Sequence, residues 1–230
     1  MKRSLLAVVA ALFCLATVVI AVSPGSAQQM QVLYPSKDNT LIESPNGDLT
    51  SSAVFVGRTN QPENSIRRGL LAFDIKDAIP AGSKVKSVKL TLNMMRTPGG
   101  KEPIELHRAL SNWGEASFSA SKGKGETASK GNATWIHTFF NTDFWKKPGG
   151  DFSTNVSAVQ TVDSTGTYTW GSTPEMVADV QAWLDSSKDN FGWLLLGNEK
   201  APKTVKVFAS RESEDSSVRP QLTVSFEPLR

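Results

Sequence analysis

The hydrophobic positions of this chain fall mostly in short alternating runs, which are separated by Gly, Pro, Asn and Ser. The clearest run is VKLTLNM at residues 88–94, where apolar and polar side chains alternate without a break. Successive side chains of a β-strand point to opposite faces, so this run predicts a strand with one buried and one solvated face. Residues 204–210 and 222–226 alternate in the same way, and we expect these two segments to pair with each other.

Two further apolar runs are denser, namely RGLLAFDI from Arg68 and FGWLLL from Phe191. Strands that are covered on both faces have near-continuous hydrophobic sequences instead of alternating ones. We therefore expect both runs to form central strands of a sandwich.

Helical periodicity stands out in one segment, residues 174–185. Its apolar side chains recur at spacings of three to four, and they are Met176, Val177, Val180, Trp183 and Leu184. Ser172 or Thr173 can cap the first amides, and Pro174 fits the first turn. The pattern as a whole predicts an all-β fold, an antiparallel sandwich that this short helix closes at one end. No fixed repeat or linker divides residues 28–230, so we expect one domain there.

The first 27 residues have the pattern of a signal peptide. Lys2 and Arg3 precede an apolar run at 5–22, and the small residues Gly25-Ser26-Ala27 follow it. We expect cleavage after Ala27 and a secreted bacterial protein with no transmembrane segment in the mature chain. The alternative is an uncleaved membrane anchor, because roughly 18 apolar residues is the lower limit for crossing a bilayer.

The charge balance argues against nucleic acid as a partner. The chain has 25 Lys and Arg and 22 Asp and Glu, and the leader contains two of the basic residues and none of the acidic ones, which leaves 23 against 22. No basic run concentrates this charge, so we expect no nucleic-acid surface. The leader also contains Cys14, the only cysteine, and the mature chain therefore has no disulfide.

Catalytic motifs are absent from the sequence. The only histidines are His107 and His137, and no metal-ligand spacing or GxSxG motif occurs. Glycoside hydrolysis needs only two carboxylates, and Glu102, Glu105 and Glu115 lie in one region. We nevertheless expect no catalytic residues. A polysaccharide lyase or hydrolase is the less favoured alternative, for which the two histidines would be the first candidate bases.

Three tryptophans lie in or beside predicted loops, with polar neighbours around them: Trp113, Trp135 and Trp145. Sugars stack on aromatic faces through their apolar C–H surface, so these rings and the nearby His137 are candidate carbohydrate contacts. The alternative is that each ring fills space beneath a long loop, because tryptophan is highly buried on average.

Three arginines are candidate contacts for an acidic sugar. Arg67, Arg68 and Arg211 each lie at the end of a β run. The planar guanidinium suits a uronate carboxylate. The alternative is that they form ion pairs with Asp74 or Glu212.

An oxygen-rich cluster precedes the first strong strand. Asp38, Glu43 and Asp48, with two asparagines between them, form a candidate structural calcium site. Their spacing does not match an EF-hand loop. We expect that no cofactor is required.

Seven segments carry a resemblance to a known family. They are DNTLIE from Asp38, RRGLLAFDI from Arg67, LHRALSNWGE from Leu106, ATWIHTFF from Ala133, FWKKPGGDF from Phe144, NFGWLLLGNE from Asn190 and FASRES from Phe208. In this order they resemble secreted bacterial DNRLRE domain proteins, which are similar to carbohydrate-binding module family 96 and to disaggregatase-related domains.

The resemblance implies a jelly-roll-like β-sandwich that binds acidic polysaccharide through basic side chains. Arg67, Arg68 and Arg211 fall on motif positions that match. The expected function is a secreted, non-catalytic module that binds an extracellular polysaccharide of the uronate type. The main alternative is a structural component of an extracellular matrix or cell surface with no specific affinity for sugar.

Overall fold

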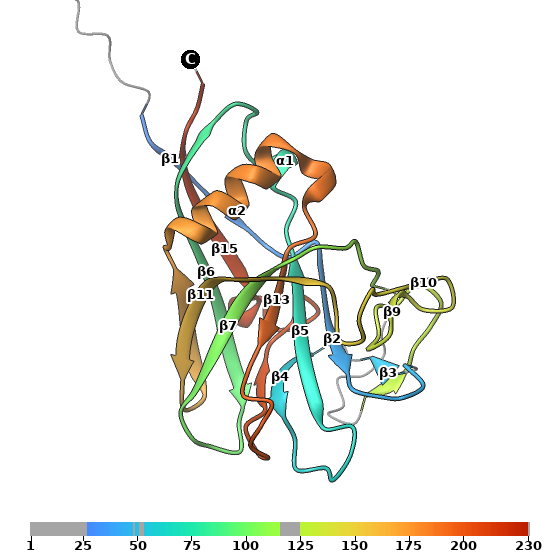
Figure 1. The fold of residues 1–230 in the computed structure, drawn as a ribbon. Helices are drawn as coiled ribbons and strands as arrows, with labels where there is room; N and C mark the ends of the chain where they lie inside the picture. The colour runs from blue at the N-terminus through green and yellow to red at the C-terminus, as the bar shows by residue number, and fades with distance from the viewer. Residues whose placement is uncertain (1–26, 48, 51–52, 116–124, 230) are drawn as a thin grey trace, which may run out of the picture.

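The computed structural model describes residues 27–47, 49–50, 53–115 and 125–229 (Figure 1). The predicted signal peptide at residues 1–27 lies outside this part of the chain, apart from Ala27. Most of the strands form one large antiparallel sheet that curls into two layers. The predicted all-β sandwich with one short capping helix is therefore confirmed.

Each layer is a run of neighbouring strands. The first layer contains β1 (Gln29–Leu33), β15 (Gln221–Glu227), β6 (Lys84–Arg96), β12 (Gly166–Gly171) and β14 (Lys206–Phe208). The second contains β2 (Lys37–Ile42), β5 (Ile66–Ala72), β13 (Trp193–Leu196), β7 (Glu102–Ala109) and β11 (Phe152–Val162). The layers are joined by β4 (Val54–Arg58), which pairs with β14 on one side and β5 on the other.

The remaining elements are short. Two small ladders pair β3 (Leu49–Thr50) with β8 (Glu126–Thr127) and β9 (His137–Phe139) with β10 (Asp143–Phe144). The helices are α1 (Ile75–Ala78), α2 (Pro174–Asp185) and the 3-10 turns Ser187–Asp189 and Ser216–Val218. No helix among the described residues is both long and apolar enough to cross a membrane.

Strand β6 is the centre of the first layer. Val88, Leu90, Leu92 and Met94 face the core and are fully buried, which confirms the predicted alternation. The predicted pairing of residues 204–210 with 222–226 is wrong. Strand β15 pairs with residues 84–91 of β6 and β14 pairs with Met94 and Arg96, because β6 is long enough to hold both along one edge.

The dense apolar runs are explained by two cores, one on each face of the second layer. Leu71 and Trp193 point into the main core between the layers. Their neighbours Leu70 and Leu194 point the other way, into a second core. Described residues of the connection after β7, among them Trp113 and Trp145, cover this outer face, so both central strands are buried on both sides, as predicted.

Helix α2 lies across one end of the sandwich (Figure 1). It begins where the sequence predicts, because the Thr173 hydroxyl accepts a hydrogen bond of 3.1 Å from the Met176 amide and Pro174 occupies the first turn. Its apolar face joins the main core, and the ring of Trp183 packs edge-on against Trp193 at a centroid distance of 4.6 Å.

Candidate functional site

The guanidinium of Arg68 already interacts with neighbouring groups of the protein. Its Nε and Nη2 atoms donate to the two carboxylate oxygens of Glu199 at 2.7 and 3.0 Å, and Nη1 donates to the carbonyl of Gly149 at 2.7 Å. The guanidinium also lies 4.9 Å above the centre of the Trp135 ring. The alternative of an internal ion pair is therefore what the geometry favours, although the partner is Glu199 and neither Asp74 nor Glu212.

Arg67 is buried, with 1% of its surface exposed. It donates to the carbonyls of Asn64 and Ile66 at 2.7 and 2.8 Å and to the side-chain oxygen of Gln61 at 2.9 Å. Burial lowers the pKa of Arg67 to about 10, with the nearby Glu43 carboxylate opposing this, so it remains charged at neutral pH. Arg67 therefore holds the loop before β5 through these hydrogen bonds, and a sugar carboxylate has little access to its guanidinium.

Arg211 is half-exposed, but two carboxylates hold it. Its Nε lies 3.1 Å from both oxygens of Glu115 and 2.8 Å from Glu212. The interaction with Glu212 is the alternative that the sequence suggested. Of the three predicted arginines, Arg211 has the most exposed side chain, at 40% against 15% for Arg68.

The loop tryptophans lie at the second core: Trp113 and Trp145 are among its buried members, and Trp135 packs against it. Trp113 and Trp145 are buried, and their ring nitrogens donate to the carbonyls of Phe191 and Thr134, each at 2.8 Å. Trp135 is half-buried, with Arg68 above it. These faces are covered because Trp113 and Trp145 pack with Leu70 of β5 and Leu194 of β13, so the space-filling alternative holds for both rings.

Both histidines are buried and hydrogen bonded. His137 Nδ1 lies 3.2 Å from the carbonyl of Gly47 and 3.0 Å from the Thr134 hydroxyl. The exposed ring of Phe144 lies against its ring at a centroid distance of 4.6 Å. His107 Nδ1 lies 2.8 Å from the carbonyl of Ser153, and Nε2 lies 3.1 Å from Glu105. Burial of His137 argues against the predicted contact with sugar.

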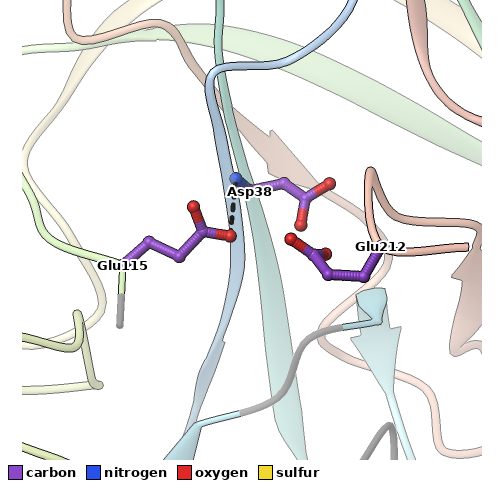
Figure 2. A group of neighbouring side chains, drawn as sticks. All are labelled: Asp38, Glu115 and Glu212. Carbon is purple, nitrogen blue, oxygen red and sulfur yellow. Dashed lines mark hydrogen bonds between the residues drawn. The ribbon is translucent and has the colours of Figure 1, made fainter. Parts of the chain in front are cut away.

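The predicted calcium cluster is not assembled as the sequence suggested. Asp48 lies outside the described residues. Glu43 turns to the start of β5, where its carboxylate accepts a hydrogen bond of 2.9 Å from the amide of Ile66. Asp38 instead lies beside Glu115 and Glu212, two acids far away in the sequence (Figure 2). We call Asp38, Glu115 and Glu212 the carboxylate cluster.

A groove on the outer face of β4, β14 and β6 is a feature that sequence reasoning missed. Along β14, Phe208 points into the main core, and Val207 points outward. Two hollows of about 340 Å³ and about 480 Å³ open on this face. Arg96 and Val207 line both hollows, so the two adjoin, and each is of a size that suits a ligand.

We call these two adjoining hollows together the outer groove. Its lining residues are Ala53, Phe55, Thr59, Asn60, Gln61, Met95, Arg96, Thr97, Pro98, Lys203, Val205, Val207, Phe208, Ala209, Ser210 and Ser213.

An irregularity in the pairing of β6 with β14 turns Arg96 toward the outer groove. Met94 pairs with Phe208 and Arg96 pairs with Val207, so one extra residue of β6 is inserted between the two pairs. Directly paired residues share a face of the sheet. Arg96 therefore shares the outer face with Val207, although Met94 two residues earlier faces the core. Bulges of this kind commonly redirect a side chain.

The outer groove is electropositive. Arg96 and Lys203 line it, and its lining contains no Asp or Glu. Neither cation forms an ion pair with any of the residues that the structure describes. The Arg96 guanidinium lies 5.9 Å from the centre of the Phe55 ring, which positions it over the floor. Two cations that lack carboxylate partners could bind an anionic ligand.

The sequence contained one signal for this groove. The alternation that begins at Val88 breaks at Met94-Met95-Arg96, and such a break is typical of a bulge.

Comparison of the chain with models of known protein families finds no match, and neither does comparison with curated protein sequences. Membership of the DNRLRE family therefore stays a prediction that rests on the seven segments.

Proposed function

We propose that this chain is a secreted, non-catalytic module that binds an acidic, uronate-type extracellular polysaccharide in the outer groove. One observation carries the proposal: Arg96 and Lys203 face a groove whose lining contains no carboxylate. A uronate polymer presents a carboxylate on each sugar, so it can engage both cations along one chain. The planar fork of arginine is well suited to such a carboxylate.

The other lining residues support the same class of ligand. Phe55, Val205 and Val207 supply an apolar floor, against which the C–H face of a sugar can pack. Asn60 and Gln61 bring amide groups to one hollow, and Ser210 and Ser213 bring hydroxyl groups to the other. A few polar groups around an apolar floor is the usual composition of a ligand site.

The burial and the hydrogen bonds of the two histidines favour a binding function over a catalytic one. Both are buried, and each Nδ1 lies within hydrogen-bond distance of a backbone carbonyl. A general base must reach the proton that it removes, and neither ring lines the outer groove. The resemblance to DNRLRE domain proteins points to binding as well.

The test is affinity electrophoresis and calorimetry of the purified protein with alginate and polygalacturonate, and with neutral laminarin for comparison. We expect the acidic polymers to bind and salt to weaken the binding, because added ions screen exposed charges. The double variant Arg96→Gln/Lys203→Gln should weaken binding at least about tenfold, since each lost contact with a carboxylate is worth ~1 kcal/mol or more.

A matched control removes the same charge elsewhere. Lys76 lies on α1 and Lys188 follows α2, at the end of the sandwich that the helices cover (Figure 1), and both side chains are exposed. Lys76→Gln/Lys188→Gln should keep wild-type affinity. Equal losses in the two double variants would mean that net charge alone governs binding, and release of reducing sugar would contradict a non-catalytic role.

A second candidate function rests on the edge strand β1. Met30 and Val32 on this strand and Tyr34 just after it alternate along the chain and are all exposed, by 70%, 41% and 53%. An apolar row at a sheet edge can pair with another protein chain. This arrangement favours a structural role in a matrix. Binding to none of the polymers, together with self-association that Met30→Lys abolishes, would support this function in place of the first.

A further inference from the structure

The carboxylate cluster joins three separate segments of the chain. Asp38 lies on β2, Glu115 follows β7, and Glu212 lies in the turn after β14 (Figure 2). One carboxylate oxygen from each lies within 4.8 Å of the other two. Three acids at this separation repel one another unless positive charge lies among them.

Asp38 is the most constrained of the three. Its side chain is fully buried, and Oδ2 accepts a hydrogen bond of 2.6 Å from the amide of Arg211. Its other oxygen, Oδ1, is buried and has no hydrogen-bond partner among the described residues. Burial, and next the charge of Glu212, raise the pKa of Asp38 well above its ordinary value. A buried carboxylate oxygen without a donor is costly, and a ligand with positive charge would remove that cost.

Arg211 satisfies only part of the cluster. It pairs with Glu115 and Glu212 at 3.0 and 2.8 Å, which leaves three carboxylates facing one guanidinium. Lys37 is nearby, but its ammonium donates to the carbonyl of Trp113 and lies 4.3 Å from the centre of that ring. The three carboxylates therefore still outnumber the cations beside them.

We propose that Asp38, Glu115 and Glu212 bind a calcium ion. All three contribute oxygen, which hard divalent cations prefer, and Ca²⁺–O distances are about 2.3–2.6 Å. One oxygen from each acid lies within 4.8 Å of the other two, so the three can converge on one ion. Mg²⁺ demands near-ideal octahedral geometry and gives up its bound waters reluctantly, so three carboxylates from three segments suit Ca²⁺ better.

The ion would fasten the turn after β14 to the edge strand β2. Ser210 and Ser213, on either side of Glu212, line the outer groove. Calcium would thereby hold one end of that groove in place. This link to ligand affinity rests on the proposed function, whereas binding of the ion itself does not.

The test uses metal-free protein with calcium alone, with no polysaccharide present. Calorimetry should give one saturable calcium site per chain, and the melting temperature should rise with calcium concentration, because a ligand that binds only the folded state stabilises it. Magnesium at the same concentration should give a smaller rise. Terbium, a substitute for calcium, should show luminescence sensitised by Trp113, which lies two residues before Glu115.

Variants distinguish a calcium site from an ion pair. Glu212 is exposed, so Glu212→Gln should fold, and we expect it to weaken calcium binding about tenfold or more. Asp38→Asn should abolish binding. Arg211→Gln removes a competing cation and should tighten binding. Glu63→Gln, at an exposed acid outside the cluster, is the control and should bind as the wild type does.

Three results would overturn the proposal: no saturable calcium binding by the wild type, binding that Glu212→Gln leaves unchanged, or loss of binding in Arg211→Gln. The failure of polysaccharide binding is a separate result. Calcium binding with no affinity for any polymer would leave the ion site in place and remove only the proposed function.

Discussion

The guanidinium of Arg68 lies 4.9 Å above the ring centre of Trp135, and Glu199 holds it there through two hydrogen bonds of 2.7 and 3.0 Å. Trp135 packs against the second core, so the arginine covers the edge of that core. The arrangement uses both the flat face and the fork of the guanidinium, which lysine cannot reproduce.

The first prediction concerns this arginine. Arg68→Lys keeps the charge but loses the two-point contact with Glu199 and the flat face over Trp135. We expect the free energy of unfolding, measured in urea, to fall by ~1–2 kcal/mol. Affinity for alginate should stay within about twofold of wild type, because this side chain is already engaged inside the protein. A large loss of affinity at unchanged stability would instead identify Arg68 as a sugar contact.

The second prediction concerns the second core. Trp145→Ala should lower the free energy of unfolding by ~3–5 kcal/mol, because it empties a buried site and leaves the Thr134 carbonyl without its donor. The neighbouring Phe144 is 66% exposed, and Phe144→Ala is the control, with an expected loss below ~1 kcal/mol. Urea unfolding followed by circular dichroism measures the free energy of unfolding of both variants. If Trp145→Ala keeps its stability but binds no polysaccharide, the ring is a ligand contact and not core.

Much of the fold could be predicted because its signals are local. The alternation along β6 and the cap of α2 each involve a few consecutive residues, and tertiary contacts reinforce both. The roles of Trp113 and Trp145 could not be predicted in the same way. Their polar neighbours suggested exposure, whereas burial comes from packing against Leu70 and Leu194, which lie on strands distant in the sequence.

The candidate sites were harder to predict, because each depends on pairing between distant segments. Arg96 enters the outer groove only because β6 has one extra residue opposite β14. In the carboxylate cluster, 77 residues separate Asp38 from Glu115, and the sequence suggested Glu43 and Asp48 as its partners instead. Local spacing identified Asp38 correctly as a member of an acidic cluster but could not identify its neighbours.

The third prediction concerns a buried lysine beside the outer groove. The ammonium of Lys206 donates to the Thr97 hydroxyl at 2.8 Å and to the carbonyls of Gly99 and Gly100 at 3.0 and 2.6 Å. Burial lowers its pKa. Lys206→Met keeps the apolar stem and removes all three hydrogen bonds, so residues 97–100 lose their anchor.

We expect Lys206→Met to reduce stability by ~1–3 kcal/mol and to speed amide hydrogen exchange at residues 97–101. Because Thr97 lines the outer groove, affinity for acidic polysaccharide should fall as well. The control is Lys200→Met, at an exposed lysine. Unchanged exchange at 97–101 would contradict the anchoring role.

The fourth prediction concerns pH and the metal-free protein. Burial raises the pKa of Asp38 well above the ordinary value of 3.8, and burial also raises the pKa of Glu115, with the hydrogen bond from Arg211 opposing the shift. The charged groups that face Asp38 are Glu115, Glu212 and Arg211. A raised pKa means that the folded protein binds the proton more tightly than the unfolded chain does. The resulting stability is fully present below about pH 3.8 and is lost as the pH rises through the raised value.

In the presence of a chelator, the melting temperature of the wild type should therefore fall relative to that of Asp38→Asn as the pH is raised above 3.8 and through the raised pKa of Asp38, because asparagine has no proton to lose. Asp38→Asn should be the more stable of the two at the upper pH. Arg58→Gln, at an arginine outside the carboxylate cluster, should follow the wild-type slope, because it retains Asp38. Parallel curves for wild type and Asp38→Asn would show that Asp38 binds its proton no more tightly in the folded protein than in the unfolded chain, which would contradict the raised pKa.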